Sequence, residues 1–288
     1  MIVDVHTHIV LKEHLSKTHE NSEVRGVPIA EFISKPEDHF RDTKRADKVF
    51  ILGFQAPFSG INIPNDFIAD YVKRDPSRFI GFMSVDPNNE NCLTEMERCK
   101  TELDLKGLKL LPMYQDFHPI DHKIAYPVYE KAQELSLPIL FHMGTTYTRE
   151  SKLKYTLPIL IEDIAHDFPQ LKIIIAHLGH PWEKDTIVLI RKQPNVFADI
   201  SALYYRPWQC YNSLRLATEY GVFDKLLFGT DYPATTIEST IKGLFAICVL
   251  ARKANLPPIK EEDIELLINR DTLKLLDLEK SKSNISTN

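Results

Sequence analysis

The sequence predicts an α/β fold, a (β/α)8 TIM barrel with an insertion after the first strand and extra helices near the C-terminal end. Three observations predict it. Short apolar segments rich in β-branched and aromatic residues recur eight times along the 288 residues. Amphipathic stretches with apolar residues three and four apart separate these segments. The repeat length of roughly 25 to 45 residues suits strand–helix units joined into a parallel sheet.

Each expected strand is nearly continuously apolar, which is typical of a parallel sheet buried on both faces. In chain order the strands are IVDVH (from Ile2), KVFILGF (from Lys48), RFIGFMSV (from Arg78), KGLKLL (from Lys106), PILFH (from Pro138), LKIIIAH (from Leu171), NVFADIS (from Asn195) and KLLFGTD (from Lys225). Eight units match the count and size of a TIM barrel. An open doubly wound sheet is the alternative, but no GxGxxG follows the first strand, which argues against a dinucleotide-binding version.

Helices are expected between the strands, and the rest of the chain extends this framework. Their segments are NDFIADYVKRD (from Asn65), CLTEMERCKTEL (from Cys92), IAYPVYEKAQEL (from Ile124), LPILIEDIAHDF (from Leu157), WEKDTIVLIRK (from Trp182) and YNSLRLATEYG (from Tyr211). More helical sequence follows from Thr236 and from Glu261. We expect one domain over residues 1–278 and a frayed polar tail over residues 279–288.

The segment between His8 and Lys48 is longer than the other connections and contains His14, His19 and His39. We expect it to form a loop and a helix over the exit of the first strand. In a barrel that position is the mouth, so the insertion is placed to line or cover a pocket.

Composition excludes several classes of protein. The net charge of −5 gives no basic stripe, so neither nucleic acid nor an anionic membrane is an expected partner. No apolar run is long enough to span a membrane, and the first residues, which read as a strand, lead us to expect no secretory leader. The four cysteines lack a CxxC spacing and are too few for a disulfide framework, which favours a reducing cytoplasm. They are Cys92, Cys99, Cys210 and Cys248.

Histidines and one aspartate stand at the ends of the expected strands. His6 and His8 lie two apart on the first strand, so period-two alternation puts both on one face. Asp4 shares that face by the same rule and is placed to orient a ligand. Barrel closure would gather five such groups at one end, namely His6, His8, His142, His177 and Asp231. Three imidazoles and a carboxylate suit Zn²⁺ well, and Mn²⁺, Fe²⁺ or Co²⁺ acceptably.

Five segments resemble the signature blocks of the amidohydrolase superfamily, specifically the amidohydrolase-related branch that includes aminocarboxymuconate semialdehyde decarboxylase. They are VDVHTHI, GLKLLPMYQDFHPID, PILFHMG, IIIAHLGHPW and LLFGTDYP. The resemblance runs from Ile2 to about Leu250. It implies a (β/α)8 barrel that holds one divalent metal, with the catalytic His177 beside the bound water. The ligands that it implies are His6, His8, His142 and Asp231.

This set of residues predicts a metal-dependent hydrolase that cleaves an amide, ester or lactone of a small molecule. A divalent metal lowers the pKa of bound water towards about 7. Asp231 can accept the water's proton as a general base, and His177 can hydrogen-bond the water or a developing oxyanion. A decarboxylase acting on a small unsaturated carboxylic acid is the alternative. A metal-binding barrel without catalysis is a third possibility, although no ligand is replaced.

Lys109 in KGLKLLP has three open interpretations. It could be a carbamylated bridge between two metals, a cation that receives a substrate carboxylate, or a partner for an inward acid such as Asp199. Alternation with Gly107 points its side chain into the barrel.

Other polar residues are expected near the mouth. Arg206 and His118 are substrate-binding candidates, and His180 is expected in a loop or behind the ligands. By the resemblance, a decarboxylase would need a cation to hold a second carboxylate of the substrate; the candidates, Arg25, Arg41 and Arg45, lie in an insertion that does not align convincingly. A homodimer is an expectation from the family alone.

Overall fold

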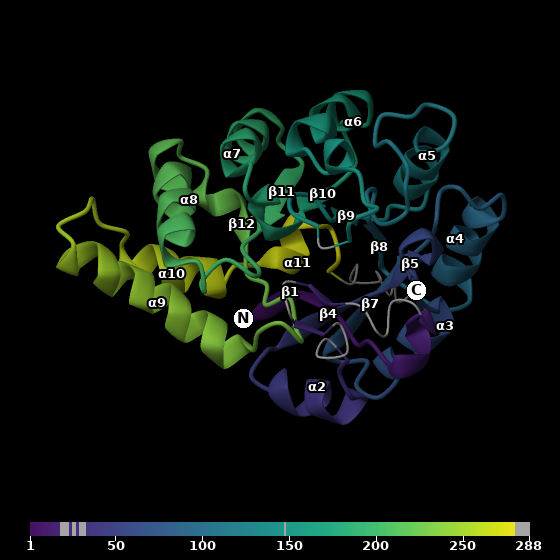
Figure 1. Cartoon of the computed structure of the whole chain (residues 1–288), viewed down its shortest axis with the longest axis horizontal. Helices are drawn as coiled ribbons and strands as arrows, with labels where there is room; N and C mark the ends of the chain where they lie inside the picture. The colour runs from purple at the N-terminus through teal and green to yellow at the C-terminus, as the bar shows by residue number, and fades with distance from the viewer. Residues whose placement is uncertain (18–22, 25–26, 29–32, 147, 280–288) are drawn as a thin grey trace, which may run out of the picture.

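A computed structural model shows eight parallel strands surrounded by helices (Figure 1). It describes residues 1–17, 23–24, 27–28, 33–146 and 148–279. In sheet order the strands are β1 (Val3–Thr7), β4 (Lys48–Leu52), β7 (Phe79–Ser84), β8 (Gly107–Leu110), β9 (Ile139–Phe141), β10 (Ile173–Ile175), β11 (Val196–Asp199) and β12 (Leu226–Leu227). Seven lie within a segment expected from the sequence, and β1 runs one residue beyond its segment, to Thr7, so the predicted strand set is confirmed.

The sheet closes between its first and last strands. β12 ends at Leu227, but parallel contacts to β1 continue beyond it. Val5 N donates to Phe228 O at 3.1 Å, and Asp231 N donates to His6 O at 2.8 Å. Thr7 and Tyr232 then form a parallel bridge. The chain is therefore a TIM barrel, and its closure brings the eighth strand end beside the first.

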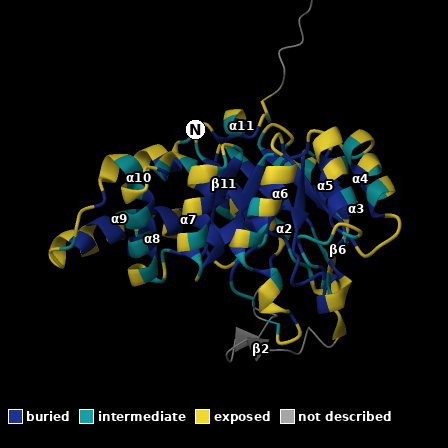
Figure 2. Ribbon diagram, turned by 90° about the horizontal axis from the view of Figure 1, so that it is seen from above, coloured by how far each residue is buried: buried dark blue, intermediate teal, exposed yellow. Residues whose placement is uncertain are grey.

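Helices cover the outside of the barrel. They are α2 (Pro36–Asp42), α3 (Asn65–Val72), α4 (Cys92–Thr101), α5 (Tyr126–Glu134), α6 (Ile161–Asp167), α7 (Glu183–Lys192), α8 (Pro207–Glu219), α9 (Ile237–Lys253), α10 (Glu261–Ile268) and α11 (Thr272–Leu275). Their inner faces and the strands are buried, while their outer faces are exposed (Figure 2). In the part of the chain that the structure describes, none of these helices is both long and apolar enough to cross a bilayer.

The barrel interior holds its own apolar cluster, separate from the core under the helices. Phe50, Phe82, Leu140 and Ile174 are among its fully buried members. Leu273 and Leu276, from α11 and the residue after it, pack into the same cluster. Figure 2 shows α11 at one end of the barrel and β6 (Ile61–Ile63) towards the other. Side chains of α11 therefore close the amino-terminal end of the barrel.

The insertion after β1 contains the expected helix, α2, together with β2 (Glu23–Val24) and β3 (Val27–Pro28). His19 and Arg25 lie outside the described residues. His39 on α2 is fully buried and bonds Thr7 Oγ1 at 3.0 Å and Tyr71 Oη at 2.8 Å. A second hairpin, β5 (Phe54–Ala56) with β6, follows β4 and was not expected from the sequence.

Candidate metal centre

Strand β1 and the residue after it place His6 and His8 at the carboxyl end of the barrel, and the strand's register shifts on the way. Its pairing with β4 is regular at Asp4 and shifts before Thr7. Val5 belongs to the barrel's interior cluster, yet the ring of the next residue, His6, also lies inside. Simple alternation does not run through the strand, so the expectation that Asp4 shares a face with His6 and His8 is wrong.

Asp4 instead ties β1 to the end of the eighth strand. Its fully buried carboxylate accepts hydrogen bonds from Thr230 N at 3.0 Å, Thr230 Oγ1 at 2.8 Å and His6 N at 3.2 Å. Burial raises the pKa of Asp4 to about 7, against these hydrogen bonds, which lower it. One carboxylate therefore fixes the backbone that carries His6 and the residue just before Asp231.

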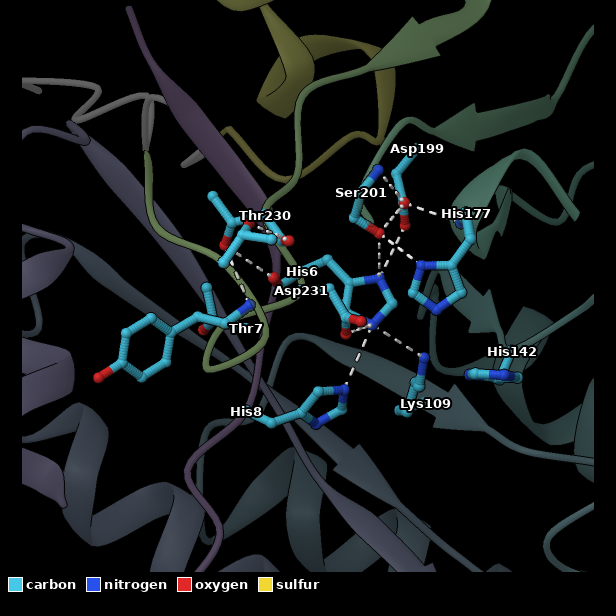
Figure 3. Close-up of polar contacts among 12 residues, drawn as sticks. His6, Thr7, His8, Lys109, His142, His177, Asp199, Ser201, Thr230 and Asp231 are labelled. Atoms are coloured by element: carbon cyan, nitrogen blue, oxygen red, sulfur yellow. Dashed lines mark hydrogen bonds and ion pairs between the residues drawn. The ribbon is translucent and has the colours of Figure 1, made fainter. Parts of the chain in front are cut away.

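Three donor atoms converge at the carboxyl end of the barrel (Figure 3). His6 Nε2 lies 3.2 Å from His8 Nε2 and 3.4 Å from Asp231 Oδ1. The three atoms all lie within 4.8 Å of one another. The Asp231 side chain keeps 23% exposure, whereas that of His6 has none, so Asp231 faces the mouth.

Asp231 occupies an unusual backbone position. Its φ is +66°, in the left-handed region that non-glycine residues rarely adopt. His177 and Leu178 are also left-handed, with φ of +54° and +50°. Such conformations persist where the surrounding structure over-determines them, and they cluster at functional sites. Two of the residues predicted to be catalytic thus lie at strained positions.

Asp199, at the end of β11, sets the proton position on His6. Its Oδ2 lies 2.9 Å from His6 Nδ1, and both side chains are fully buried. A carboxylate only accepts, so Nδ1 carries the ring proton and Nε2 keeps its lone pair. That lone pair faces His8 and Asp231. Carboxylate–histidine pairs of this kind orient metal ligands. An acid at the end of the seventh strand is a sequence signal for orienting a ligand. From the sequence, Asp199 is nevertheless predicted only as a partner for Lys109.

His177 and His142 stand beside the three converging atoms. The ring of His177 stacks on that of His6 at 4.7 Å between centroids, and the ring of His142 lies 5.0 Å from that of His177. His142 Nε2 bonds Thr145 O at 3.1 Å. His142 is therefore adjacent to the cluster but directed towards its own loop, unlike His6, His8 and Asp231.

Burial keeps the imidazoles neutral. It lowers the pKa of His6, His8 and His177 well below the ordinary value, and that of His142 to about 3. Neutral imidazoles offer lone pairs, and the buried His8 Nδ1 has no hydrogen-bond partner among the described residues. The donor set of two or three imidazoles and one carboxylate fits a divalent metal. A second grouping of His6, His177 and Asp199 fits less well, because hydrogen bonds already occupy its facing atoms.

Lys109 adds a cation to this interior, as its alternation with Gly107 predicted. Its side chain is fully buried, and Nζ lies 3.5 Å from His6 Nε2. Burial lowers its pKa to about 8, while Asp199 and Asp231 act to raise it. Within the described part of the chain Lys109 forms no contact ion pair, because Asp199 is bonded to His6, Ser201 and the His177 backbone. The proposed pairing with Asp199 is therefore absent.

An aromatic wall borders one side of the cluster. Phe54 on β5 packs against His8 at 5.9 Å between centroids, and Tyr114 packs against His142 at 5.2 Å. Phe54 and Tyr114 also contact each other at 5.5 Å. Neither residue stands out in the sequence, and the hairpin that carries Phe54 was not expected.

Arg206 and His180 lie near the cluster without contacting its three converging donors. The guanidinium of Arg206 lies 4.6 Å from the Tyr205 ring centroid and donates to Ala202 O, and its charge opposes the rise that burial causes in the pKa of Asp231. His180 is buried, with its ring 6.0 Å from that of His177. Burial and the charge of Arg206 lower the pKa of His180 to about 4.

The remaining candidates lie elsewhere. The ring of His118 packs on Tyr155 at 5.2 Å between centroids, and its Nδ1 accepts a hydrogen bond from Ile120 N in the same turn. Within the described residues it makes no contact with the cluster. Arg41 pairs with Asp38 and Asp42 on the surface, and Arg45 pairs with Glu238. Neither arginine reaches the converging donors.

Comparison with known proteins agrees with this geometry. The chain belongs to the amidohydrolase family, whose model matches residues 3–267. It is 25% identical over 268 residues to a 2-keto-4-carboxy-3-hexenedioate hydratase from Sphingobium, covering 72% of this chain and 77% of that protein. It is 27% identical over 217 residues to a gamma-resorcylate decarboxylase from Polaromonas, covering 60% and 66%. The protein is thus an enzyme of the amidohydrolase superfamily, which uses a divalent metal.

Solved structures share the fold. An uncharacterised TIM-barrel protein from Bordetella bronchiseptica superposes with a TM-score of 0.73 at 20% identity, covering 96% of this chain and 98% of that one. A dihydroxybenzoic acid decarboxylase from Polaromonas, with bound manganese and the inhibitor 2-nitroresorcinol, superposes with a TM-score of 0.68 at 17% identity, covering 97% and 98%. At these identities the likeness supports the barrel alone.

Proposed function

We propose that this enzyme is a metal-dependent decarboxylase of a small unsaturated carboxylic acid. His6, His8 and Asp231 would hold the metal; His142, the fourth ligand predicted from the sequence, has its Nε2 on Thr145 O and would have to turn its ring to join them. A bound divalent metal supplies positive charge that polarises substrate oxygens as a Lewis acid. The observation that carries the proposal is the buried ammonium group of Lys109, 3.5 Å from His6 Nε2.

Lys109 is placed to receive the substrate's carboxylate. An ammonium group without a contact counterion is costly to bury, and a bound carboxylate would offset that cost. Because Nζ adjoins the converging donors, an acid held there lies next to them. The aromatic wall of Phe54 and Tyr114 offers a flat apolar surface to an unsaturated body.

Asp231 is placed to supply the proton that replaces the carboxylate. Burial raises its pKa to about 8, while Lys109 opposes that rise. A carboxylate that binds a metal is ionised, so Asp231 would take up the proton for carbon from solvent, on the oxygen that does not face the metal. Decarboxylation breaks one C–C bond, leaves its electron pair in the conjugated system and requires one proton at carbon. Asp231 can give that proton and regain it from solvent through the mouth.

The sequence alone favours hydrolysis and leaves decarboxylation as the alternative; with the geometry in view, decarboxylation becomes the first candidate. The related gamma-resorcylate decarboxylase and the related hydratase are both named for small unsaturated acids, which supports an acid as substrate. Hydrolysis of an amide, ester or lactone is the second candidate. The position of His177 beside the cluster favours it, because a neutral imidazole there can take a proton from an attacking water.

The test is a paired activity screen. Protein stripped with chelator would be reloaded with Zn²⁺ or Mn²⁺ and offered a panel of small unsaturated and aromatic acids, following CO2 release. A parallel panel of lactones, esters and amides would be followed by acid release. Metal-dependent CO2 release supports the proposal, and hydrolysis alone would replace it with the second candidate. Failure to take up a stoichiometric divalent metal would remove both.

A further inference from the structure

Ser201 is a fully buried hydroxyl at the centre of the site to which the sequence assigned no role. It follows β11 by two residues and precedes Ala202, whose φ is +57°. Its Oγ lies 2.5 Å from Asp199 Oδ1 and 2.7 Å from His177 Nδ1 (Figure 3). His6 Nδ1 is farther away, at 3.3 Å. The hydroxyl therefore lies between a carboxylate and the predicted catalytic imidazole.

The direction of these bonds follows from counting protons. A hydroxyl has one proton to donate, and an ionised carboxylate has none. If Ser201 donated to His177, its oxygen would face Asp199 Oδ1 with no proton between them, which is repulsive at this distance. Ser201 therefore donates to Asp199 and accepts from His177 Nδ1. In the neutral ring Nδ1 then carries the hydrogen, and Nε2 keeps its lone pair.

We infer that Ser201 is a positioning residue that, with Asp199, holds the neutral His177 ring in the Nδ1–H form. The lone pair on His177 Nε2 is then available to accept a proton at the site. In this form His177 accepts a proton or an O–H bond and does not donate to an oxyanion from Nε2. The inference deepens the proposed function, since it rests on His177 acting at that site.

Asp199 connects the ring of His177, through Ser201, with the ring of the metal ligand His6. Its Oδ2 accepts from His6 Nδ1 at 2.9 Å, and its Oδ1 accepts from Ser201 Oγ and from the backbone N of His177 at 2.9 Å. One carboxylate thus fixes the ring proton of a metal ligand directly and that of His177 through Ser201. Ser201→Ala should break only the second connection, because Asp199 keeps its bond to His6.

The test reads the ring proton itself in metal-free protein. The protonated and unprotonated nitrogens of a neutral imidazole differ widely in ¹⁵N chemical shift, and the His177 signals would be identified by their loss in His177→Asn. The wild type should show Nδ1 protonated, and Ser201→Ala should shift the ring to a mixture or to the Nε2–H form. Ser213→Ala is the matched control, because Ser213 is also buried but donates to Gln209 O within α8, its one side-chain bond among the described residues.

Metal content and turnover complete the test. Metal content of Ser201→Ala should equal that of the wild type, while kcat falls roughly tenfold to a hundredfold, part of the ~10²–10⁴-fold that a positioned acid or base contributes. An unchanged His177 ring in Ser201→Ala, or a wild-type ring with Nε2 protonated, would overturn the inference. Because the ¹⁵N reading needs no substrate, it stands or falls separately from the decarboxylase assignment.

Discussion

Asp199 Oδ2 lies 2.9 Å from His6 Nδ1, on the side of the ring away from the donors that converge on Nε2. This pair places the lone pair of His6 towards His8 and Asp231 before any metal arrives. Each member is fully buried, so water does not compete for the bond.

Asp199→Asn should therefore weaken metal binding. An amide can donate to His6 Nδ1 and so favour the wrong ring form, and loss of such a partner lowers metal affinity by about 10–100-fold. Competition with a chromophoric chelator would measure the affinity. Asp224→Asn, an exposed acid at the other end of the barrel, is the control. Equal affinities for the two variants would contradict the role of Asp199.

His177→Asn should separate chemistry from metal binding. His177 stacks on His6 but is not one of the three converging donors, so metal content should stay near the wild-type value. Turnover should fall by about 10²–10⁴-fold if the imidazole transfers a proton. Elemental analysis and initial rates on the same sample would show both. Undiminished turnover would show that His177 is not catalytic.

Lys109→Met should lower activity without lowering stability. The substitution removes a buried charge that has no contact counterion in the described structure, and burying such a charge costs free energy that an apolar side chain of similar length does not. Denaturant unfolding and the KM for the acid substrate would be measured together. Lys106→Met, three residues earlier and half-exposed beside Asp104, serves as the control. An unaltered KM would remove Lys109 from substrate binding.

Gly229→Ala should disturb the site through packing alone. A Cβ at this position would lie 3.1 Å from His6 Cβ and 3.3 Å from Ser201 Cβ, closer than ordinary contact. Overpacking of this kind costs about 1–3 kcal/mol, and here it pushes on the backbone that carries His6. Both the melting temperature and the metal affinity should decrease. A stable variant with normal metal affinity would show that β1 and β12 have room to separate.

His39 should make folding sensitive to acid. Burial lowers its pKa from 6.5 to about 3, so between these values the unfolded chain binds a proton that the folded protein does not. Stability from this group is thus complete above pH 6.5 and decreases as the pH falls, by about 1.4 kcal/mol per pH unit. In His39→Gln the free energy of unfolding should therefore depend less steeply on pH, by that amount per pH unit. Tyr71→Phe keeps the histidine and should retain the slope, and equal slopes for His39→Gln and the wild type would refute the assignment.

Sequence periodicity was sufficient for the barrel and for much of the site. The strand segments that end in His6, His142, His177 and Asp231 are short, apolar and evenly spaced, so the positions of their ends could be predicted. The inward direction of Lys109 followed from its alternation with Gly107, whose missing side chain leaves room for Phe82. These inferences need only the even spacing of the strands and the alternation of side chains within one strand.

The features that escaped prediction depend on local irregularity or distant packing. The shift in β1 between Asp4 and Thr7 has no sequence signature, and it moved Asp4 to another role. The bond from His142 to Thr145 O depends on the path of one loop. The role of Ser201 needs the left-handed turn at Ala202 and the direction of a single hydroxyl, neither of which a residue pattern specifies.

The packing of Leu273 and Leu276 into the barrel's interior has a kinetic consequence. Among the residues that the structure describes, these side chains and the apolar cluster above them fill the amino-terminal end, so the converging donors open to solvent at the mouth. Substrate and the non-gaseous product use this opening in turn. In the proposed reaction the decarboxylated product should therefore inhibit competitively with the acid substrate, and bulky groups added to the loops at the mouth should slow entry and exit together.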